Sequence, residues 1–163
     1  MKIAILSDTH NNLANLDAAL ERIRQEEVTT LIHCGDLTGV EVASRLAGWR
    51  VIFTYGNGDF ASGEIRETLL ALNPESTAEL VFTGYLGGAR IAVTHGHLPG
   101  QMDELLDLRL YEYVFHGHSH RQRDVRIKNS RVINPGALGG MHVEPRQFCL
   151  LDLDTGKAEY IHI

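Results

Sequence analysis

Cysteine is scarce in this chain of 163 residues, where Cys34 and Cys149 are the two thiols. They lie far apart and form no C-x-x-C pair, so a framework of disulfides is disfavoured. We expect both to pack as small apolar side chains, and we predict a cytoplasmic protein.

Positive charge and long apolar runs are also scarce. Lysine and arginine total 15 against 21 aspartates and glutamates, which gives a formal net charge of -6. This balance disfavours binding to an extended nucleic-acid backbone, although a bound metal ion could still attract nucleotides or nucleic-acid ends. The first apolar run stops at Leu6. It is too short for a signal peptide or a membrane span and is typical of a buried strand. Whether the protein forms a homo-oligomer stays open.

Hydrophobic residues make up 44% of the chain, as in soluble proteins, and their order is informative. In the first half, short β-branched segments alternate with patterns of helical period, which predicts a parallel sheet with right-handed crossovers. Predicted strands cover residues 2–6, 30–34 and 51–55. Predicted helices cover about residues 12–26 and 40–48, and a third has Ser62 as N-cap and Ile65, Leu69 and Leu72 on one face.

The second half is rich in short strands. Segments 79–84 and 90–95 flank the turn-like sequence YLGGA and are typical of a hairpin, and a short helix over residues 101–110 follows. Further strands are predicted over residues 113–117, 124–128, 131–134, 147–154 and 158–163, and we expect this part to be antiparallel. The chain, residues 1–163, is therefore predicted to be one α/β domain with two stacked sheets flanked by helices.

Polar side chains follow five of the predicted strands, beside glycine in four of the five. They are Asp8 and His10 in SDTH, Asp36 in HCGD, Asn57 and Asp59 in YGNGD, His95 and His97 in THGH, and His118 and His120 in HGHSH. Sites in α/β proteins are built at strand ends. Because residues two apart in extended chain face the same side, Asp8 can converge with His10, and His118 with His120. Sharp turns at these places are expected at Gly35, Gly56, Gly96 and Gly117.

The donor atoms in this pattern are nitrogen and oxygen, with no thiolate. They suit divalent transition metals, Mn first, with Fe, Co, Ni or Zn as alternatives. The candidate ligands are Asp8, His10, Asp36, Asn57, His95, His118 and His120, which is more than one ion needs. Two ions sharing a bridging carboxylate would use them all. Such a pair, about 3.5–4 Å apart, acts as a clamp for in-line displacement at phosphorus by a bridging hydroxide.

Taken in order, the motifs resemble those of the calcineurin-like metallophosphoesterase superfamily, marked by D-x-H, G-D, G-N-x-D, H and G-H-x-H. Here they stand as Asp8-Thr-His10, Gly35-Asp36, Gly56-Asn57-Gly-Asp59, His95 and Gly117-His118-Ser-His120. Over nearly its whole length the chain is most similar to the small single-domain branch of YfcE-type phosphodiesterases. The segment INPGALG resembles that branch's Asn-Pro-Gly-Ser segment, with Ala137 in place of serine. The resemblance implies a four-layer αββα sandwich.

The resemblance also implies a ligand assignment. One ion would take Asp8, His10 and His120, the other would take Asn57, His95 and His118, and Asp36 would bridge them. Asn57 would in addition help to position the phosphate. The implied activity is that of a dinuclear metal-dependent phosphoesterase acting on a small phosphodiester, in preference to a monoester.

The chain departs from the family pattern at Gly58. Many members have a histidine there as a candidate acid for the leaving group, and the YfcE-type branch often has a cysteine. Glycine has no side-chain proton to donate, and Asp59 would lose the partner that it orients in some relatives. We expect that His97 or water supplies the proton, or that good leaving groups are preferred.

The other histidines and two other functions complete the interpretation. His33 and His116 lie inside predicted strands and are expected to pack behind the ligands, and His142 is a weaker candidate for the pocket wall.

A non-catalytic scaffold, like the retromer subunit of the same branch, would explain Gly58 but would not need a complete ligand set. A zinc hydrolase of the metallo-β-lactamase kind would explain HGHSH but leaves Asp8-x-His10 without a role.

Overall fold

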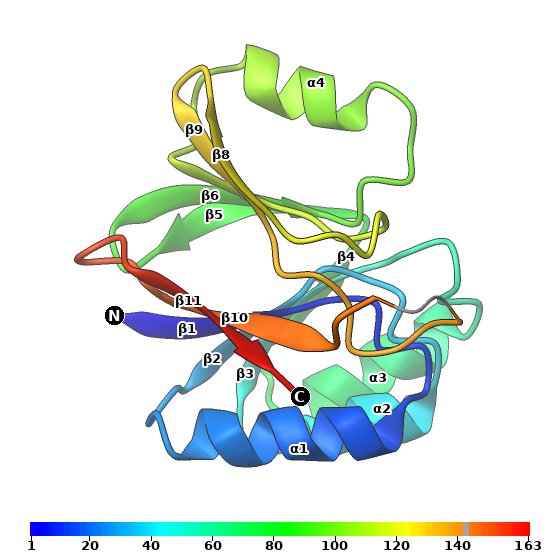
Figure 1. Ribbon diagram of the computed structural model, residues 1–163. Coiled ribbons are helices and arrows are strands. Elements are labelled where there is room, and N and C mark those ends of the chain that lie inside the picture. Colours follow the sequence, from blue (N-terminus) through cyan, green and yellow to red (C-terminus); the bar gives the residue numbers. More distant parts are fainter. Residues whose placement is uncertain (142–143) are drawn as a thin grey trace.

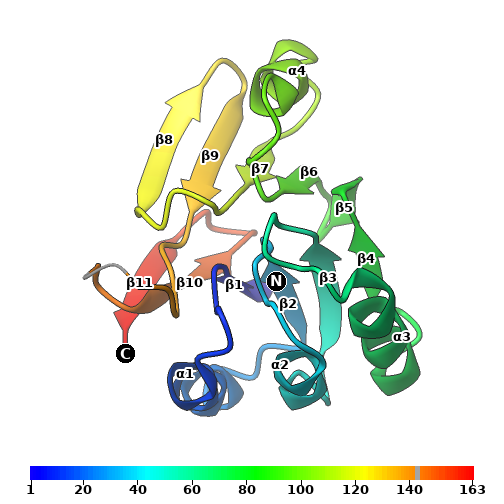
Figure 2. The ribbon, with the colours of Figure 1, turned by 90° about the vertical axis from the view of Figure 1, so that its right-hand side faces the viewer.

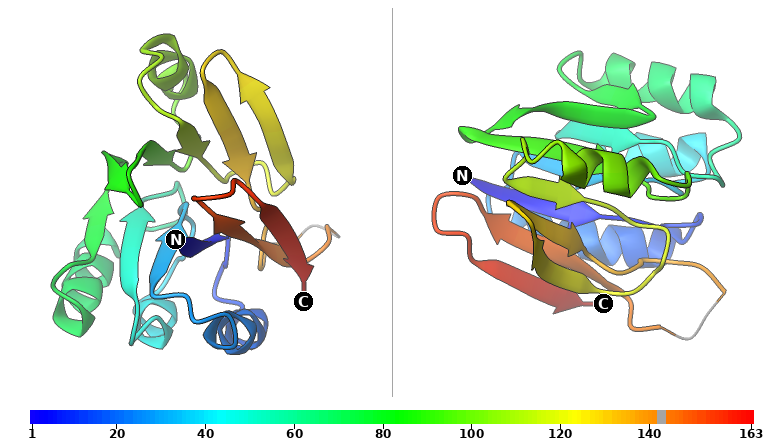
Figure 3. Two further views of the ribbon diagram at one scale, coloured as in Figure 1. Left: turned by 90° about the vertical axis from the view of Figure 1, so that its left-hand side faces the viewer. Right: turned by 90° about the horizontal axis from the view of Figure 1, so that it is seen from above.

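The structure, a computed structural model, describes residues 1–141 and 144–163 and has four layers (Figure 1). One outer layer consists of the helices α1 (Leu13–Arg24), α2 (Val40–Arg45) and α3 (Ser62–Leu72). These helices cover a six-stranded sheet, which stacks on a five-stranded sheet. The fourth layer is α4 (Gln101–Asp107), on the outer face of the second sheet (Figure 3). The predicted αββα sandwich is confirmed.

The six-stranded sheet is parallel in its first-half strands. Its order is β11 (Ala158–His162), β10 (Gln147–Asp152), β1 (Lys2–Leu6), β2 (Thr30–His33), β3 (Arg50–Thr54) and β4 (Thr77–Glu79). The strands β1 to β4 are parallel, whereas β10 and β11 are antiparallel additions at one edge. The prediction omitted β4, because three residues are too few to show a period of two.

The five-stranded sheet is mixed. Its order is β5 (Val81–Leu86), β6 (Ala89–Thr94), β7 (Tyr113–Phe115), β9 (Ser130–Asn134) and β8 (Arg123–Ile127). Hairpins join β5 to β6 and β8 to β9, but β6, β7 and β9 are parallel. The expectation of an antiparallel second half is therefore wrong at β7. The reason is the connection through α4, which returns the chain from the end of β6 to the side of the sheet where β6 begins. The next strand, β7, therefore runs parallel to β6.

The core of the sandwich follows the alternation of side chains along the strands. In β1, Ala4 and Leu6 pack toward the helices, whereas Ile3 and Ile5 lie between the two sheets. All four are fully buried. A strand that is covered on both faces appears in the sequence as a continuous apolar run, as the segment 2–6 does.

The N-caps of α1 and α3 differ, and for α3 a cap was predicted. Asn12 caps α1, because its side chain accepts a hydrogen bond from the amide of Asn15 at 3.1 Å. The predicted cap Ser62 is wrong. The carbonyl of Ala61 accepts the first helical bond from Ile65, so Ala61 is the N-cap and Ser62 is already inside α3.

The strands β1, β2 and β3 end on the same side of the molecule as β6 and β7, and this side faces the viewer in Figure 2. The segments that follow these ends carry the predicted ligands. Among the described residues, no helix combines the length and the apolar character that spanning a membrane requires.

Candidate metal centre

The predicted ligands lie just beyond the strands, and five of the seven lie in left-handed turns. Asp8, His10, Asp36, His118 and His120 have φ angles between 45° and 65°. Asp8 and His10 converge as predicted, but the reason given for the two pairs, an extended backbone, is wrong. A left-handed φ in a residue with a Cβ costs about 1–2 kcal/mol. Five such residues around one cluster indicate that tertiary contacts impose these turns.

Asp8 lies at the centre of the cluster and is fully buried. Its Oδ2 atom accepts hydrogen bonds from the Ser7 hydroxyl at 2.5 Å and from the His118 amide at 3.1 Å. Its Oδ1 atom lies 3.2 Å from Nε2 of His120 and 3.8 Å from Nε2 of His10. One oxygen is thus held by the protein, and the other is turned toward two imidazoles.

Asp36 divides its two oxygens in the same way. The amide of Gly58 donates to Oδ1 at 2.6 Å, and Oδ2 lies 3.5 Å from Nε2 of both His10 and His95. Burial raises the pKa of Asp36, but the neighbouring His95 and the Gly58 amide outweigh burial and lower it to about 2. The side chain is therefore a carboxylate at neutral pH.

His95 offers a clear test of whether a cation fits here. Its Nδ1 atom donates to the Cys34 carbonyl at 2.7 Å, which leaves the lone pair of the neutral ring on Nε2. That Nε2 is buried and makes no hydrogen bond. It lies 3.5 Å from Oδ2 of Asp36 and 4.0 Å from Oδ1 of Asp8. A divalent cation would satisfy this nitrogen and both oxygens, so the residues fit a metal ion.

Two groups of side chains bring their ligand atoms close enough for an ion. The groups are Asp8 with His10 and His120, and Asp8 with Asp36 and His95, and in each the ligand atoms lie within 4.8 Å of one another. The residue that they share is Asp8, whereas Asp36, the predicted bridge, belongs to the second group and lies 3.5 Å from His10 of the first. The predicted ligands Asn57 and His118 belong to neither group. Asn57 is exposed on the loop after β3, and the His118 ring lies beside His95, with 5.1 Å between the ring centroids.

His97 lies at the edge of the cluster. Its ring centroid is 5.3 Å from that of His95 and 6.3 Å from that of His118. Burial and these two imidazoles lower the pKa of His97. The ring is therefore mainly neutral at pH 7.

His33 and His116 lie behind the ligands, as predicted. His33 is fully buried and its Nε2 is 2.8 Å from the Thr9 hydroxyl, and Nδ1 of His116 is 3.1 Å from the Gly117 carbonyl. Burial lowers the pKa of each to about 4. Neither belongs to the two ligand groups. The weaker candidate His142 lies outside the described residues.

Asp59 has main-chain partners in place of the histidine that Gly58 removes. The residue is 6% exposed, and its carboxylate accepts hydrogen bonds from three amides, those of Asp36, Thr38 and Gly56, at 2.7–2.8 Å. It therefore ties the loop after β2 to the loop after β3. Sequence reasoning missed this role, because main-chain donors leave no signal in the side-chain pattern.

The four glycines at which sharp turns were predicted are needed for two different reasons. Gly35 and Gly96 have φ of 95° and 89°, which supports the predicted sharp turns. Gly56 and Gly117 do not have a positive φ, so the predicted reason is wrong for them. A Cβ at Gly117 would collide with the Ser7 hydroxyl, and one at Gly56 with Oδ1 of Asp36. These two glycines make room for the side chains around the cluster.

Three supporting residues were not predicted from the sequence. The Ser7 hydroxyl bonds Asp8, as described above. Asn134, at the end of β9, donates to the Gly117 carbonyl at 2.8 Å. Oε2 of Glu144 lies 3.6 Å from Nδ1 of His120. Only Asn134 had a usable signal, a polar residue at a strand end in the segment INPGALG.

We expect metal affinity to fall as the pH falls. His120 has a raised pKa because of Asp8, and the carboxylates Asp36 and Asp8 raise the pKa of His95 although burial lowers it. Protons therefore compete for these nitrogens from above pH 6.5 downward. Below the pKa, affinity should drop roughly tenfold per pH unit for each histidine that must lose its proton. Calorimetric titration of the metal-free protein with Mn at pH 8, 7 and 6 measures this, and a constant affinity would contradict it.

Two stacked mixed sheets, with carboxylates and imidazoles gathered where the strands end, define a protein of the metallophosphoesterase class. The chain belongs to the calcineurin-like phosphoesterase superfamily, because the model of that domain matches residues 1–156. It is 33% identical over 165 residues to phosphodiesterase MJ0936 of Methanocaldococcus jannaschii, with 100% of this chain and 98% of that protein covered. The recognised family is confirmed.

Solved structures agree with this assignment. The structure of an archaeal phosphodiesterase matches with a TM-score of 0.95 at 30% identity, and all of both chains is covered. YfcE, a phosphoesterase from E. coli, matches with a TM-score of 0.70 at 22% identity over all of both chains, which shows the shared fold. The protein is a hydrolase of phosphoric esters.

Proposed function

We propose that the protein is a phosphodiesterase that acts with two divalent transition-metal ions, Mn first among them. The observation that carries the proposal is the pair of overlapping ligand groups around Asp8 and Asp36, with a buried unbonded nitrogen on His95. Asp8, His10 and His120 would hold one ion. Asn57, His95 and His118 would hold the other, and Asp36 would lie between them.

The side chains of the cluster have separate tasks in this proposal. Bound ions would polarise the phosphoryl oxygens and lower the pKa of a water molecule for in-line attack. Asp36 stays ionised because its pKa is about 2, and the Gly58 amide orients it through Oδ1. Asn57 is exposed on its loop, and in this proposal its carboxamide would also meet a phosphoryl oxygen.

The test is hydrolysis of bis(4-nitrophenyl) phosphate by the metal-free protein before and after addition of Mn. We expect activity that depends on Mn, is abolished by excess EDTA and exceeds that toward 4-nitrophenyl phosphate. A preference for the monoester would contradict the phosphodiesterase assignment. If saturating Mn gave no hydrolysis of either ester, the non-catalytic scaffold would be favoured.

The scaffold alternative has less support than the enzyme. It accounts for Gly58, but it needs neither the ionised Asp36 nor the buried unbonded nitrogen of His95. The single domain and the cytoplasmic location stay predictions, and the oligomeric state stays open.

His97 is proposed to protonate the leaving oxygen. We expect His97→Asn to slow hydrolysis of diesters with poor leaving groups by roughly 10²-fold, and to leave 4-nitrophenyl esters nearly unchanged. Since the acid form exists below a lowered pKa, the wild-type rate with poor leaving groups should rise as the pH falls below 6.5, provided that Mn is kept saturating at each pH.

The measurement is kcat across aryl esters whose leaving groups differ in pKa. The matched control is His162→Asn, since His162 is an exposed histidine of β11. An equal loss for all leaving groups would show that His97 acts in binding rather than in proton transfer.

A further inference from the structure

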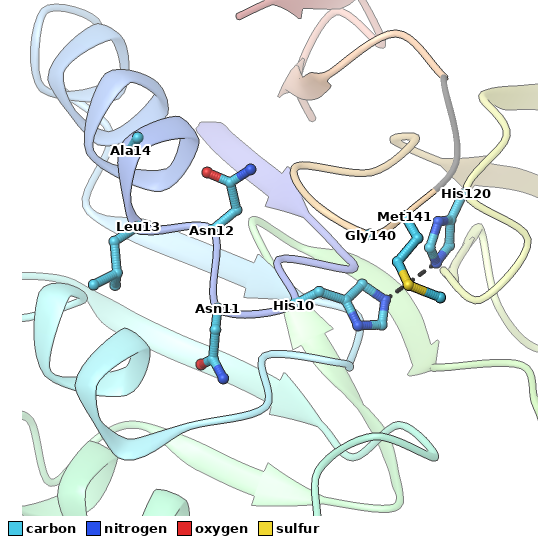
Figure 4. Close-up of a pocket in the computed structure, with 8 residues that line it drawn as sticks. All are labelled: His10, Asn11, Asn12, Leu13, Ala14, His120, Gly140 and Met141. Carbon is cyan, nitrogen blue, oxygen red and sulfur yellow. Dashed lines mark hydrogen bonds between the residues drawn. The ribbon is translucent and has the colours of Figure 1, made fainter.

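An open pocket adjoins one end of the metal cluster. It has a volume of about 830 Å³ and is bordered by the ligands His10 and His120. Figure 4 shows Met141 on the side of these two rings and Leu13 and Ala14 across the pocket, at the start of α1. Pockets for small ligands have volumes of about 300–1,000 Å³. This one can therefore hold a substantial part of a substrate.

The wall of the pocket that carries Met141 consists of residues 138–141, and main-chain hydrogen bonds fix it to the ligand loops. The amide of Leu138 donates to the Ser7 carbonyl at 3.2 Å, and that of Gly139 donates to the Asp8 carbonyl at 2.8 Å. The Arg146 guanidinium donates to the carbonyls of Gly139 and Gly140, the latter at 2.8 Å. These hydrogen bonds hold the wall in a defined position beside the metal ligands.

The same wall passes directly over a metal ligand. Gly140 has a φ of 94°, and a Cβ there would lie 2.7 Å from Cε1 of His120. Met141 follows this close approach with 98% of its surface exposed. An exposed methionine in this place is available to a substrate that is bound at the metal cluster.

The chemistry of the lining points to an uncharged ligand. The described lining residues include no lysine, arginine, aspartate or glutamate. Leu13, Ala14 and Met141 offer apolar surface, and Asn11 adds an uncharged carboxamide. The polar side chain of Asn12 is already engaged as the cap of α1. The amino end of α1 also borders the pocket and would favour a second anionic group, which makes such a group the competing occupant.

We propose that this pocket binds the non-leaving ester group of the phosphodiester, and that this group is uncharged and apolar or aromatic. The inference rests on the proposed function. His97, the proposed acid, neighbours His95 and His118, whereas the pocket borders His10 and His120. The leaving oxygen therefore lies toward His97, and the retained group lies toward Met141.

The test compares phenyl 4-nitrophenyl phosphate with methyl 4-nitrophenyl phosphate, which share a leaving group and differ in the retained one. We expect the wild type with Mn to prefer the phenyl ester by about tenfold or more in kcat/KM, since apolar burial stabilises the larger group. Met141→Ala should reduce kcat/KM for the phenyl ester several-fold and change that for the methyl ester less than about twofold. Leu13→Ala should act in the same direction.

The matched control is Leu108→Ala, because Leu108 follows α4 on the other sheet and is 54% exposed. Equal kcat/KM for the two esters, with no selective effect of Met141→Ala, would overturn the pocket inference while leaving the phosphodiesterase intact. A preference for a retained group with a second phosphate would overturn it in favour of the anionic occupant. If neither ester were hydrolysed, the proposed function would fail, and the pocket inference with it.

Discussion

Asp36→Asn is expected to lower kcat/KM for a phosphodiester by at least about 10³-fold. The substitution removes the negative charge that faces His10 and His95 at 3.5 Å, while the amide of Gly58 can still reach one oxygen. Stabilisation of transition-state charge by a bound ion is worth several kcal/mol, and about 1.4 kcal/mol corresponds to a tenfold change in rate. The measurement is steady-state kinetics with Mn, together with the number of ions bound at saturation.

The stoichiometry distinguishes the bridging role from a general loss of fold. We expect fewer ions per chain in Asp36→Asn and an unchanged far-UV circular dichroism spectrum. The matched control is Asp17→Asn, because Asp17 is a half-exposed carboxylate on α1 that pairs with Arg45. Full activity of Asp36→Asn with undiminished metal binding would contradict the assignment of Asp36 between the ions.

Asp59→Ala is expected to lower both stability and metal affinity. Removal of the carboxylate leaves the amides of Asp36, Thr38 and Gly56 without their acceptor in a buried place. Each buried unsatisfied group costs about 1–3 kcal/mol, but the Thr38 and Gly56 amides are only partly buried, so we expect a loss of about 2–5 kcal/mol in the free energy of unfolding. Because the freed loop carries Asp36, affinity for Mn should fall about 10–100-fold, as for other supports of metal ligands.

Two measurements separate support of the loop from simple destabilisation. Urea denaturation of the metal-free protein gives the first effect, and Mn titration at a temperature where the variant is folded gives the second. Asp59→Asn keeps one acceptor oxygen and should recover part of both. Asp103→Ala, at an exposed carboxylate in the first turn of α4, should change neither. Normal Mn affinity in folded Asp59→Ala would show that Asp59 serves stability alone.

Much of the fold can be predicted from the order of the residues. Segments such as 2–6, apolar without interruption, indicate strands that are covered on both faces, and their alternation with helical periods indicates a parallel sheet. The grouping of Asp8, His10 and His120 is also predictable, since polar residues after successive strands meet at one edge. The hydrophobic period of a segment and the place where a strand ends depend on residues that are close in the sequence. Both can therefore be recognised without knowledge of the fold.

Other features depend on the folded chain. The contact between His10 and His120 joins residues 110 positions apart, and the bond from the Asp36 amide to Asp59 joins residues 23 apart. The left-handed turns at the ligands and the parallel direction of β7 likewise follow from how distant segments pack. So does the pocket that Leu13 and Met141 border. Each of these contacts forms only when loop closure brings separate segments together, and a linear pattern carries no record of which main-chain groups will then meet.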